Sequence, residues 1–360
     1  MSLLRLAARL PAHAAFRALG APRALPFSLV LSVTYRCNSR CSTCNVWQRQ
    51  ADELTLSEWT RIFERLGRAP YYLTFSGGEP FLRDDLVELV AAGYRLCRPA
   101  VITIPTNGLL SKRIAPAVEA IVQAAPGAQV GINLSLDGVG EAHDRIRRVP
   151  GNWERALETY AALRALHYPN LTISIHTVIS TLNVADLPQI YAGLMALEPD
   201  SYITEVAEQR GELGTLGMPI TPAPEQYAEA ARFLIEKLAE RRFAGFARIT
   251  QAFRARYYAL ATRILAEGRQ IIPCYAGWAS GHIAPDGDVW TCCTRAEPIG
   301  NLRQTDYDLR PIWFGAGAAR LRRSIAAGEC ACPMANASYT NMLFHLPTVL
   351  GVAWELRPAG

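Results

Sequence analysis

The sequence of residues 29–44 is LVLSVTYRCNSRCSTC, and this stretch decides the fold. Its first half is rich in β-branched and apolar residues and predicts a β-strand that ends at Thr34. Its second half places Cys37, Cys41 and Cys44 on one short loop directly after that strand. Three thiolates on a tight loop are able to bind three corners of a four-iron cubane, which leaves the fourth iron open. A structural zinc site normally needs four protein ligands, and this loop supplies three.

Further β-rich segments follow along the chain, with amphipathic segments between them. We expect strands over residues 28–34, 71–76, 101–106, 130–136, 172–178 and 201–206. We expect helices over residues 56–66, 153–166 and 224–242, one opened by Asp84 and Asp85, and one over 254–265. The alternation predicts an α/β fold, a partial (β/α)6 TIM-like barrel whose active site lies at the carboxyl ends of the strands.

Short polar motifs follow the predicted strands. Gly77, Gly78, Glu79 and Pro80 follow the second strand, Thr106-Asn107-Gly108 ends the third, and Ser135-Leu136-Asp137-Gly138 ends the fourth. Adjacent glycines let the backbone approach a ligand closely, and Glu79 is able to accept a charge-assisted hydrogen bond from an ammonium group. Each motif alone is also typical of an ordinary turn.

The motifs in this order resemble the radical S-adenosylmethionine (SAM) superfamily, beginning with Cys-x3-Cys-x2-Cys after the first strand. The resemblance implies that Cys37, Cys41 and Cys44 hold a [4Fe-4S] cluster whose open iron binds SAM. It also implies an arginine that pairs with the SAM carboxylate, for which we choose Arg147 over Arg145 and Arg148. The SAM contacts implied by the resemblance are Gly77, Gly78, Glu79, Pro80, Thr106, Asn107, Ser135, Asp137 and Arg147.

The resemblance further implies a reaction class. An external one-electron reductant such as flavodoxin or ferredoxin would drive reductive cleavage of SAM to methionine and a 5′-deoxyadenosyl radical, which abstracts hydrogen from the substrate. At the ends of the fifth and sixth strands, His176 and Glu205 are the catalytic candidates. Gln209 and Tyr275 are weaker candidates. A polar strand residue satisfied by its neighbours is the alternative in each case.

A second group of cysteines lies near the C-terminus. Cys274, Cys292, Cys330 and Cys332 resemble the ligands of the SPASM and twitch modules that follow radical SAM barrels, and imply a second [4Fe-4S] cluster in a small Cys-rich α+β module. Residues 286–290 predict a hairpin turn. Cys293 is either a substitute ligand or a bystander. Zinc in a four-cysteine ribbon stays open as the alternative.

Composition and charge set the limits of the remaining regions. We divide the 360 residues into a basic arm (1–26), the barrel (27–245), a helical bridge (246–270), the cysteine module (271–335) and a tail (336–360). Residues 1–51 hold seven arginines and no acidic residue, so any attraction to an anionic surface belongs to the arm. We expect the arm to pack its leucines on the body, and contact with a membrane surface is the alternative. The remainder is nearly neutral, and no nucleic-acid partner is expected. Clustered cysteines without an export signal point to a reducing, cytoplasmic location.

Three hypotheses for the function follow. The first is an enzyme acting on a small-molecule or lipid-like substrate, because too few residues precede the first strand to form a peptide-recognition domain. The second is a maturase of a ribosomal peptide, because auxiliary clusters are frequent in such enzymes. The third is a structural or electron-carrier iron-sulfur or zinc protein without SAM chemistry.

Overall fold

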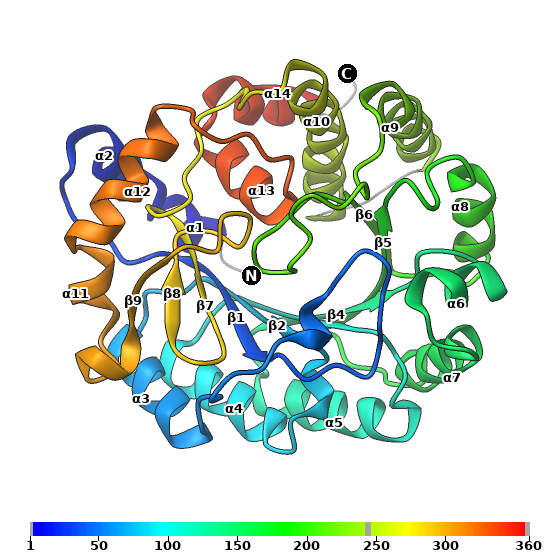
Figure 1. Cartoon of the computed structure of the whole chain (residues 1–360), viewed down its shortest axis with the longest axis horizontal. Coiled ribbons are helices and arrows are strands. Elements are labelled where there is room, and N and C mark those ends of the chain that lie inside the picture. The colour runs from blue at the N-terminus through cyan, green and yellow to red at the C-terminus, as the bar shows by residue number, and fades with distance from the viewer. Residues whose placement is uncertain (1–2, 242–245, 357–360) are drawn as a thin grey trace.

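A single curved sheet of nine strands organises the chain (Figure 1). The computed structural model describes residues 3–241 and 246–356. The strand order is β6-β5-β4-β3-β2-β1-β7-β8-β9, and β1 to β6 are parallel. The expected α/β partial barrel is therefore confirmed.

The six barrel strands lie where the sequence places them, within one residue at each end. Their bounds are β1 (Ser28–Thr34), β2 (Tyr72–Gly77), β3 (Val101–Thr106), β4 (Gln129–Ser135), β5 (Leu171–Ile179) and β6 (Ser201–Val206). The helices after β1 to β5 are α3 (Leu56–Leu66), α4 (Leu86–Cys97), α5 (Ser111–Ala124), α6 (Glu141–Arg147), α7 (Asn152–Arg164) and α8 (Leu187–Met195). Figure 1 shows α3, α4, α5 and α7 along the outer side of the sheet.

Helix α3 illustrates why these segments fold as they do. Thr55 accepts a hydrogen bond from the Glu58 amide, and the Glu58 side chain accepts one from the Thr55 amide, which forms a capping box. Trp59, Ile62 and Phe63 on the inner face of the helix are completely buried in the core that includes alternate residues of β1. Apolar side chains that recur every 3.6 residues in the helix thus pack against those that alternate along the strand.

The cysteine-rich segment shares the sheet of the barrel. Strand β7 (Ser280–Ile283) pairs in parallel with β1, and β8 (Asp288–Trp290) and β9 (Pro298–Asn301) continue the sheet in antiparallel fashion. The predicted hairpin is present between β7 and β8, and Gly287 occupies its turn with a φ of 89°. The module is thereby fixed to the strand that precedes the first cysteine loop.

The remaining helices lie outside the repeated units. They are α1 (Leu3–Ala7), α2 (Leu10–Leu19), α9 (Pro224–Ala239), α10 (Phe246–Glu267), α11 (Leu309–Trp313), α12 (Ala316–Ala326), α13 (Ala335–Phe344) and α14 (Leu346–Glu355). Helix α9 ends at Ala239, whereas the sequence predicts a helix that reaches residue 242. Residue 242 and the predicted end of the barrel at residue 245 both lie outside the described residues. The region expected as a tail from 336 is helical over most of its length, in α13 and α14, and Met342 of α13 belongs to the main core.

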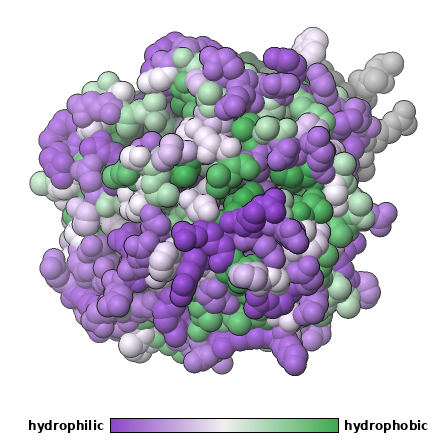
Figure 2. Space-filling view, turned by 45° about the vertical axis from the view of Figure 1, so that its right-hand side comes forward, coloured by the Kyte–Doolittle hydropathy of each residue, from purple (hydrophilic) through white to green (hydrophobic). Residues whose placement is uncertain are grey.

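The arm packs on the cysteine module. Arg17 of α2 donates a hydrogen bond to the Cys274 carbonyl oxygen at 3.0 Å, and its guanidinium lies over the rings of Tyr275 and Trp278. Phe16 is buried in the same apolar cluster. Across residues 3–241 and 246–356, no helix is both long and apolar enough to span a bilayer. On the face drawn in Figure 2, apolar residues form small patches among polar ones.

Candidate active site

A cavity of about 350 Å3 lies at the carboxyl ends of the barrel strands. This volume is in the lower part of the range for small-molecule and cofactor sites. The predicted site residues that line it are Cys37, Cys41, Cys44, Gly77, Gly78, Glu79, Thr106, Asn107, Ser135, Asp137, Arg147, His176 and Glu205. Pro80 does not line the cavity, because it starts the buried turn Pro80–Leu82 behind the loop. The fold therefore brings together residues spread over nearly 170 positions of the chain.

Hydrogen-bond donors surround the sulfur atoms of the first cysteine loop. The Ser39 amide lies 3.5 Å from Cys37 Sγ. The Ser39 hydroxyl lies 3.2 Å from Cys41 Sγ and also donates to the Arg147 carbonyl oxygen at 3.3 Å. Arg147 Nη1 is 3.5 Å from Cys41 Sγ, and the Val46 amide is 3.5 Å from Cys44 Sγ. Donors directed at sulfur stabilise thiolate ligands and tune the potential of an iron-sulfur cluster.

Burial disfavours free thiolates in this loop. It raises the pKa of Cys37 to about 11 and that of Cys44 to about 12. A cationic iron site offsets this penalty, because a metal-bound thiol is deprotonated. None of the nine cysteines of the chain forms a disulfide. Three thiols on one loop, surrounded by donors and open to a cavity, fit a cluster with one unligated iron.

Gly77 and Gly78 allow the end of β2 to touch the cysteine loop. A Cβ atom on Gly77 would lie 2.2 Å from the Thr34 carbonyl oxygen, and one on Gly78 would lie 2.2 Å from the Arg36 carbonyl oxygen. Gly77 also has a φ of 117°, which side chains rarely permit. The contact is closed by hydrogen bonds from the Gly78 amide to Thr34 O at 2.8 Å and from the Glu79 amide to Arg36 O at 2.9 Å.

Glu79 is a buried carboxylate held by three donors. It accepts hydrogen bonds from the Asn107 amide at 2.8 Å, the Thr106 hydroxyl at 3.0 Å and the Phe81 amide at 3.2 Å. Burial nevertheless raises the pKa of Glu79 to about 7. A cation in the cavity would therefore favour the charged form of this group. The Asn107 side chain also donates to Asn38 Oδ1 at 2.7 Å, which joins the third strand to the cysteine loop.

Arg147 and Asp137 form a buried ion pair beside the cysteine loop. Arg147 Nη2 lies 2.8 Å from Asp137 Oδ2, and both side chains are almost inaccessible to solvent. The Arg147 Nε atom is buried and has no hydrogen-bond partner, so the guanidinium has a donor available for a ligand in the cavity. Arg145 is exposed and pairs with Glu141, and Arg148 is exposed as well. The structure thus places Arg147 in the cavity and its two competitors on the surface.

His143 orients the loop that carries Asp137. Its Nδ1 accepts a hydrogen bond from the Asp137 amide at 3.1 Å, so its Nε2 carries the proton and donates to Asn152 Oδ1 at 3.2 Å. Burial is the main cause that lowers the pKa of His143 to about 4. The histidine is accordingly neutral and positions the loop without adding charge.

His176 of β5 and Glu205 of β6 line the same cavity from adjacent strands, and His176 pairs with Ser135 of β4. Burial lowers the pKa of His176, and Glu205 acts in the opposite direction. Burial would raise the pKa of Glu205, but Arg210 and His176 outweigh it and the net shift is downward. Arg210 Nη2 lies 3.3 Å from Glu205 and 3.2 Å from Glu208. A proton donor or acceptor is thus available in the cavity at the ends of β5 and β6.

Several cavity residues were missed from the sequence. Glu208, Arg210 and Glu212 follow β6, and Tyr339 comes from α13. Glu208, Arg210 and Glu212 could have been predicted as cavity residues because they follow the end of a strand. No feature of the sequence around Tyr339 predicts that it reaches the cavity. Gln209 is exposed and bonds within its own loop to Gly217 and Met218, so it does not face the cavity. Tyr275 stacks on Phe344 with ring centroids 3.8 Å apart and likewise lies elsewhere.

The second set of cysteines lies together, away from the cavity wall. Cys274, Cys292 and Cys330 belong to one apolar cluster. Burial raises the pKa of Cys332 well above its usual value, and the charges of Glu208, Cys274 and Cys292 act in the same direction. Cys293 packs with Met334 and Ala337 in another cluster, against which Cys332 also lies, and it lines the cavity. Four nearby thiols in an apolar setting fit a protein-ligated iron-sulfur cluster.

The comparisons with known proteins agree with this geometry. The family model described as Radical SAM superfamily matches residues 31–192, and a model for an iron-sulfur cluster-binding domain matches residues 274–333. PqqA peptide cyclase of Ruegeria pomeroyi is 30% identical over 308 residues, which cover 81% of this chain and 75% of that protein. The chain belongs to the radical SAM superfamily. As a radical SAM enzyme it uses a [4Fe-4S] cluster and SAM, and the second model implies additional iron-sulfur clusters.

Other similarities of this radical SAM chain are more limited. Pre-heme d1 synthase of Dinoroseobacter shibae is 30% identical over 169 residues, and the chain spans only 39% of that protein. The crystal structure of Streptococcus suis SuiB bound to precursor peptide SuiA has a TM-score of 0.62 at 14% identity, covering 86% of this chain and 70% of that one. The structural likeness concerns the fold. Membership in the superfamily makes the chain an enzyme rather than a structural or electron-carrier protein.

Proposed function

We propose that this radical SAM enzyme modifies a peptide. The observation that carries the proposal is the extent of the similarity to a protein named as a peptide cyclase, which reaches across four fifths of this chain. The relative named for a tetrapyrrole, pre-heme d1 synthase, aligns with 45% of this chain. This difference favours a peptide over the small-molecule or lipid-like substrate that we expected first.

The roles of the cavity residues follow from their contacts. Cys37, Cys41 and Cys44 would hold the SAM-binding cluster, which when bound supplies the electron that cleaves SAM to methionine and a 5′-deoxyadenosyl radical. The buried Glu79 carboxylate would accept a hydrogen bond from the SAM ammonium, and Arg147 would donate its unpaired Nε to the carboxylate. Asp137 keeps the Arg147 guanidinium in place.

The ends of β5 and β6 would bind substrate. His176 and Glu205 face the same space as the cysteine loop, and Arg210 holds Glu205 in its ionised form. An ionised carboxylate at this position is able to accept a peptide N–H or to remove a proton from the substrate. Ser135, Thr106 and Asn107 also line the cavity and would contact the SAM adenosine portion.

The auxiliary cysteines would bind a second [4Fe-4S] cluster. Cys274, Cys292, Cys330 and Cys332 supply the four thiolates that a closed cubane needs. An external one-electron reductant such as flavodoxin or ferredoxin would deliver electrons to the enzyme. Iron analysis tests the ligand sets separately, because a Cys37→Ala/Cys41→Ala/Cys44→Ala variant should lose about half of the iron and a Cys274→Ala/Cys292→Ala variant the other half.

The substrate class is tested with the holoenzyme under anaerobic conditions. The reconstituted enzyme is given SAM, a reductant and the short peptides encoded beside its gene, and each peptide is followed by mass spectrometry. A mass change that needs SAM and is absent with the triple-cysteine variant would support the proposal. If 5′-deoxyadenosine forms but deuterium enters it only from a labelled metabolite, the substrate is a small molecule. If no 5′-deoxyadenosine forms above the variant, the assignment of the cluster loop is wrong.

A further inference from the structure

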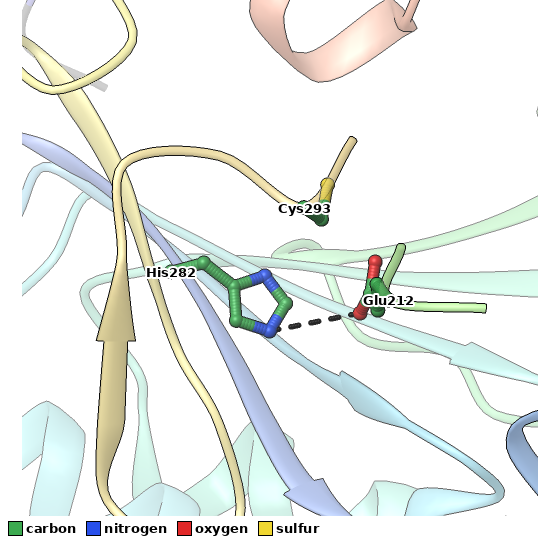
Figure 3. Close-up of side chains that lie close together, drawn as sticks. All are labelled: Glu212, His282 and Cys293. Carbon is green, nitrogen blue, oxygen red and sulfur yellow. Dashed lines mark ion pairs between the residues drawn. The ribbon is translucent and has the colours of Figure 1, made fainter. Parts of the chain in front are cut away.

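Three buried side chains of metal-binding type converge beside the cavity without a role in the chemistry described above. Glu212, His282 and Cys293 each offer one ligand atom, and these atoms lie within 4.8 Å of one another. Figure 3 shows them approaching from three separate segments: His282 from β7, Cys293 from the loop after β8 and Glu212 from the loop after β6. Among the described residues, no other set of three or more His, Cys, Asp and Glu side chains brings its ligand atoms within this distance.

The hydrogen bonds determine which nitrogen of His282 is available. The Ser32 hydroxyl donates to Glu212 Oε1 at 3.1 Å, so its oxygen is left to accept from His282 Nε2 at 2.9 Å. His282 therefore carries its proton on Nε2, and its Nδ1 presents a lone pair. That Nδ1 atom is buried and has no hydrogen-bond partner. A buried lone pair without a donor costs free energy unless a cation or a ligand occupies the space before it.

The arrangement matches the outer contacts of known metal-binding histidines. A metal-bound histidine usually donates its second N–H to an oxygen that fixes the ring orientation. Ser32 supplies that oxygen here, and Trp290 stacks on the ring with centroids 4.6 Å apart. Cys293 is 5% exposed, and its thiol makes one described polar contact, to the thioether of Met334, which is a weak acceptor.

Cys293 has surroundings that differ from those of Cys292, although the two are adjacent in the sequence. Cys292 packs in the apolar cluster of Cys274 and Cys330, whereas Cys293 packs with Met334 and Ala337, with Cys332 against the same cluster. Cys293, and not Cys292, lines the cavity and meets Glu212 and His282. The bystander alternative for Cys293 leaves the unpaired His282 Nδ1 unexplained.

We propose that Glu212, His282 and Cys293 bind one divalent metal ion of borderline softness, such as Zn2+, on the wall of the cavity. The ionised carboxylate and thiolate would neutralise the two charges of the ion, which offsets the cost of burying each group. One sulfur, one nitrogen and one oxygen form the three-ligand set of an open zinc site. Ligand atoms on one such ion stand about 3.5 Å apart, so the three side chains would have to close by up to about 1 Å. Glu212 Oε1 lies 3.6 Å from His282 Nε2 (Figure 3), so its carboxylate would also have to turn toward Nδ1.

The fourth position of the ion would face substrate. Glu212 and Cys293 both line the cavity, whereas His282 lies behind them. The ion would thus be a Lewis acid that takes an oxygen or nitrogen atom of the bound substrate. This inference does not depend on whether the substrate is a peptide.

Zinc K-edge X-ray absorption of the holoenzyme tests the site, because iron clusters do not contribute at that edge. The enzyme is equilibrated anaerobically with Zn2+ and freed of loosely bound metal. We expect about one zinc per chain, with one sulfur neighbour at about 2.3 Å and nitrogen or oxygen neighbours at about 2.0 Å. No retained zinc would overturn the proposal. Zinc with four sulfur neighbours would overturn it too, since that set belongs to the auxiliary cysteines.

Variants locate the ion. Cys293→Ala and His282→Ala should lose the zinc and keep the iron, while Cys97→Ala, a buried thiol on α4, should keep both. Retention of an unchanged zinc spectrum in Cys293→Ala would refute the site. Ser32→Ala should raise the zinc dissociation constant by about 10- to 100-fold with full iron content, because His282 Nε2 loses its acceptor. An unchanged constant in that variant would also count against the proposal. If His282→Ala fails to hold iron, the zinc spectrum of the wild-type enzyme and the zinc dissociation constant of Ser32→Ala still test the proposed site.

Discussion

Replacing Gly78 with alanine should disable the enzyme without touching any cysteine. A Cβ atom at this position would lie 2.2 Å from the carbonyl oxygen of Arg36 and 2.8 Å from that of Tyr35. Both oxygens belong to the backbone that leads into the cysteine loop. Because backbone atoms are unable to rotate away as a side chain does, the end of β2 and the loop have to separate.

The size of the effect follows from that separation. Real Cβ contacts essentially never fall below 3.0 Å, so the gap must open by about 0.8 Å. The 2.9 Å hydrogen bond from the Glu79 amide to Arg36 O would then exceed bonding distance, at a cost of about 1 kcal/mol. Overpacking adds about 1 to 3 kcal/mol, for a total loss of about 2 to 4 kcal/mol. A shift of about 1 Å at a reacting centre lowers the rate about 100-fold.

The assay compares Gly78→Ala with Gly131→Ala. A Cβ atom on Gly131 meets Thr103 at 3.4 Å, an ordinary contact in the same sheet. Formation of 5′-deoxyadenosine should fall about 100-fold in Gly78→Ala and stay within about twofold in Gly131→Ala. The thermal midpoint of unfolding should fall only in the first. Equal activity and equal midpoints in the two variants would refute the argument that the β2 end and the cysteine loop must touch.

Three further perturbations test the surroundings of the site. Asp137→Asn leaves the buried Arg147 guanidinium without a counter-charge and should lower the free energy of unfolding by about 3 to 5 kcal/mol in urea titrations; a loss below about 1 kcal/mol would contradict the ion pair. Burial holds the pKa of His143 at about 4 against 6.5 in the unfolded chain, so the stability present above pH 6.5 should fall by up to about 3 kcal/mol as the pH drops toward 4. His143→Gln should flatten that part of the curve of midpoint against pH, and an equally steep curve would argue against a neutral buried ring. Arg17→Ala removes the hydrogen bond to the Cys274 carbonyl and should speed proteolytic cleavage of the N-terminal arm about tenfold, whereas unchanged cleavage would mean that the arm is held by its apolar contacts alone.

The barrel was predictable because its signals are local. The strand over 28–34 and the helix over 56–66 have the bounds that β-branched content and the Thr55 cap predict. Parallel strands place their carboxyl ends at one edge, so motifs that follow successive strands had to meet. The cysteine module was expected as a separate unit, but β7 pairs with β1; this pairing joins residues about 250 positions apart and has no local signal.

The sequence by itself determined the reaction class, because three cysteines on one loop and polar motifs after successive strands are set by spacing along the chain. Only the tertiary structure decided which arginine enters the cavity, since Arg145, Arg147 and Arg148 differ in the direction they take from α6. Only the curved sheet brings Cys293, in the loop after β8, to His282 on β7 and to Glu212, which lies about 80 positions earlier in the chain. Spacing fixes local geometry, whereas contacts between distant segments depend on how the sheet curves and on which surfaces the hydrophobic core brings together.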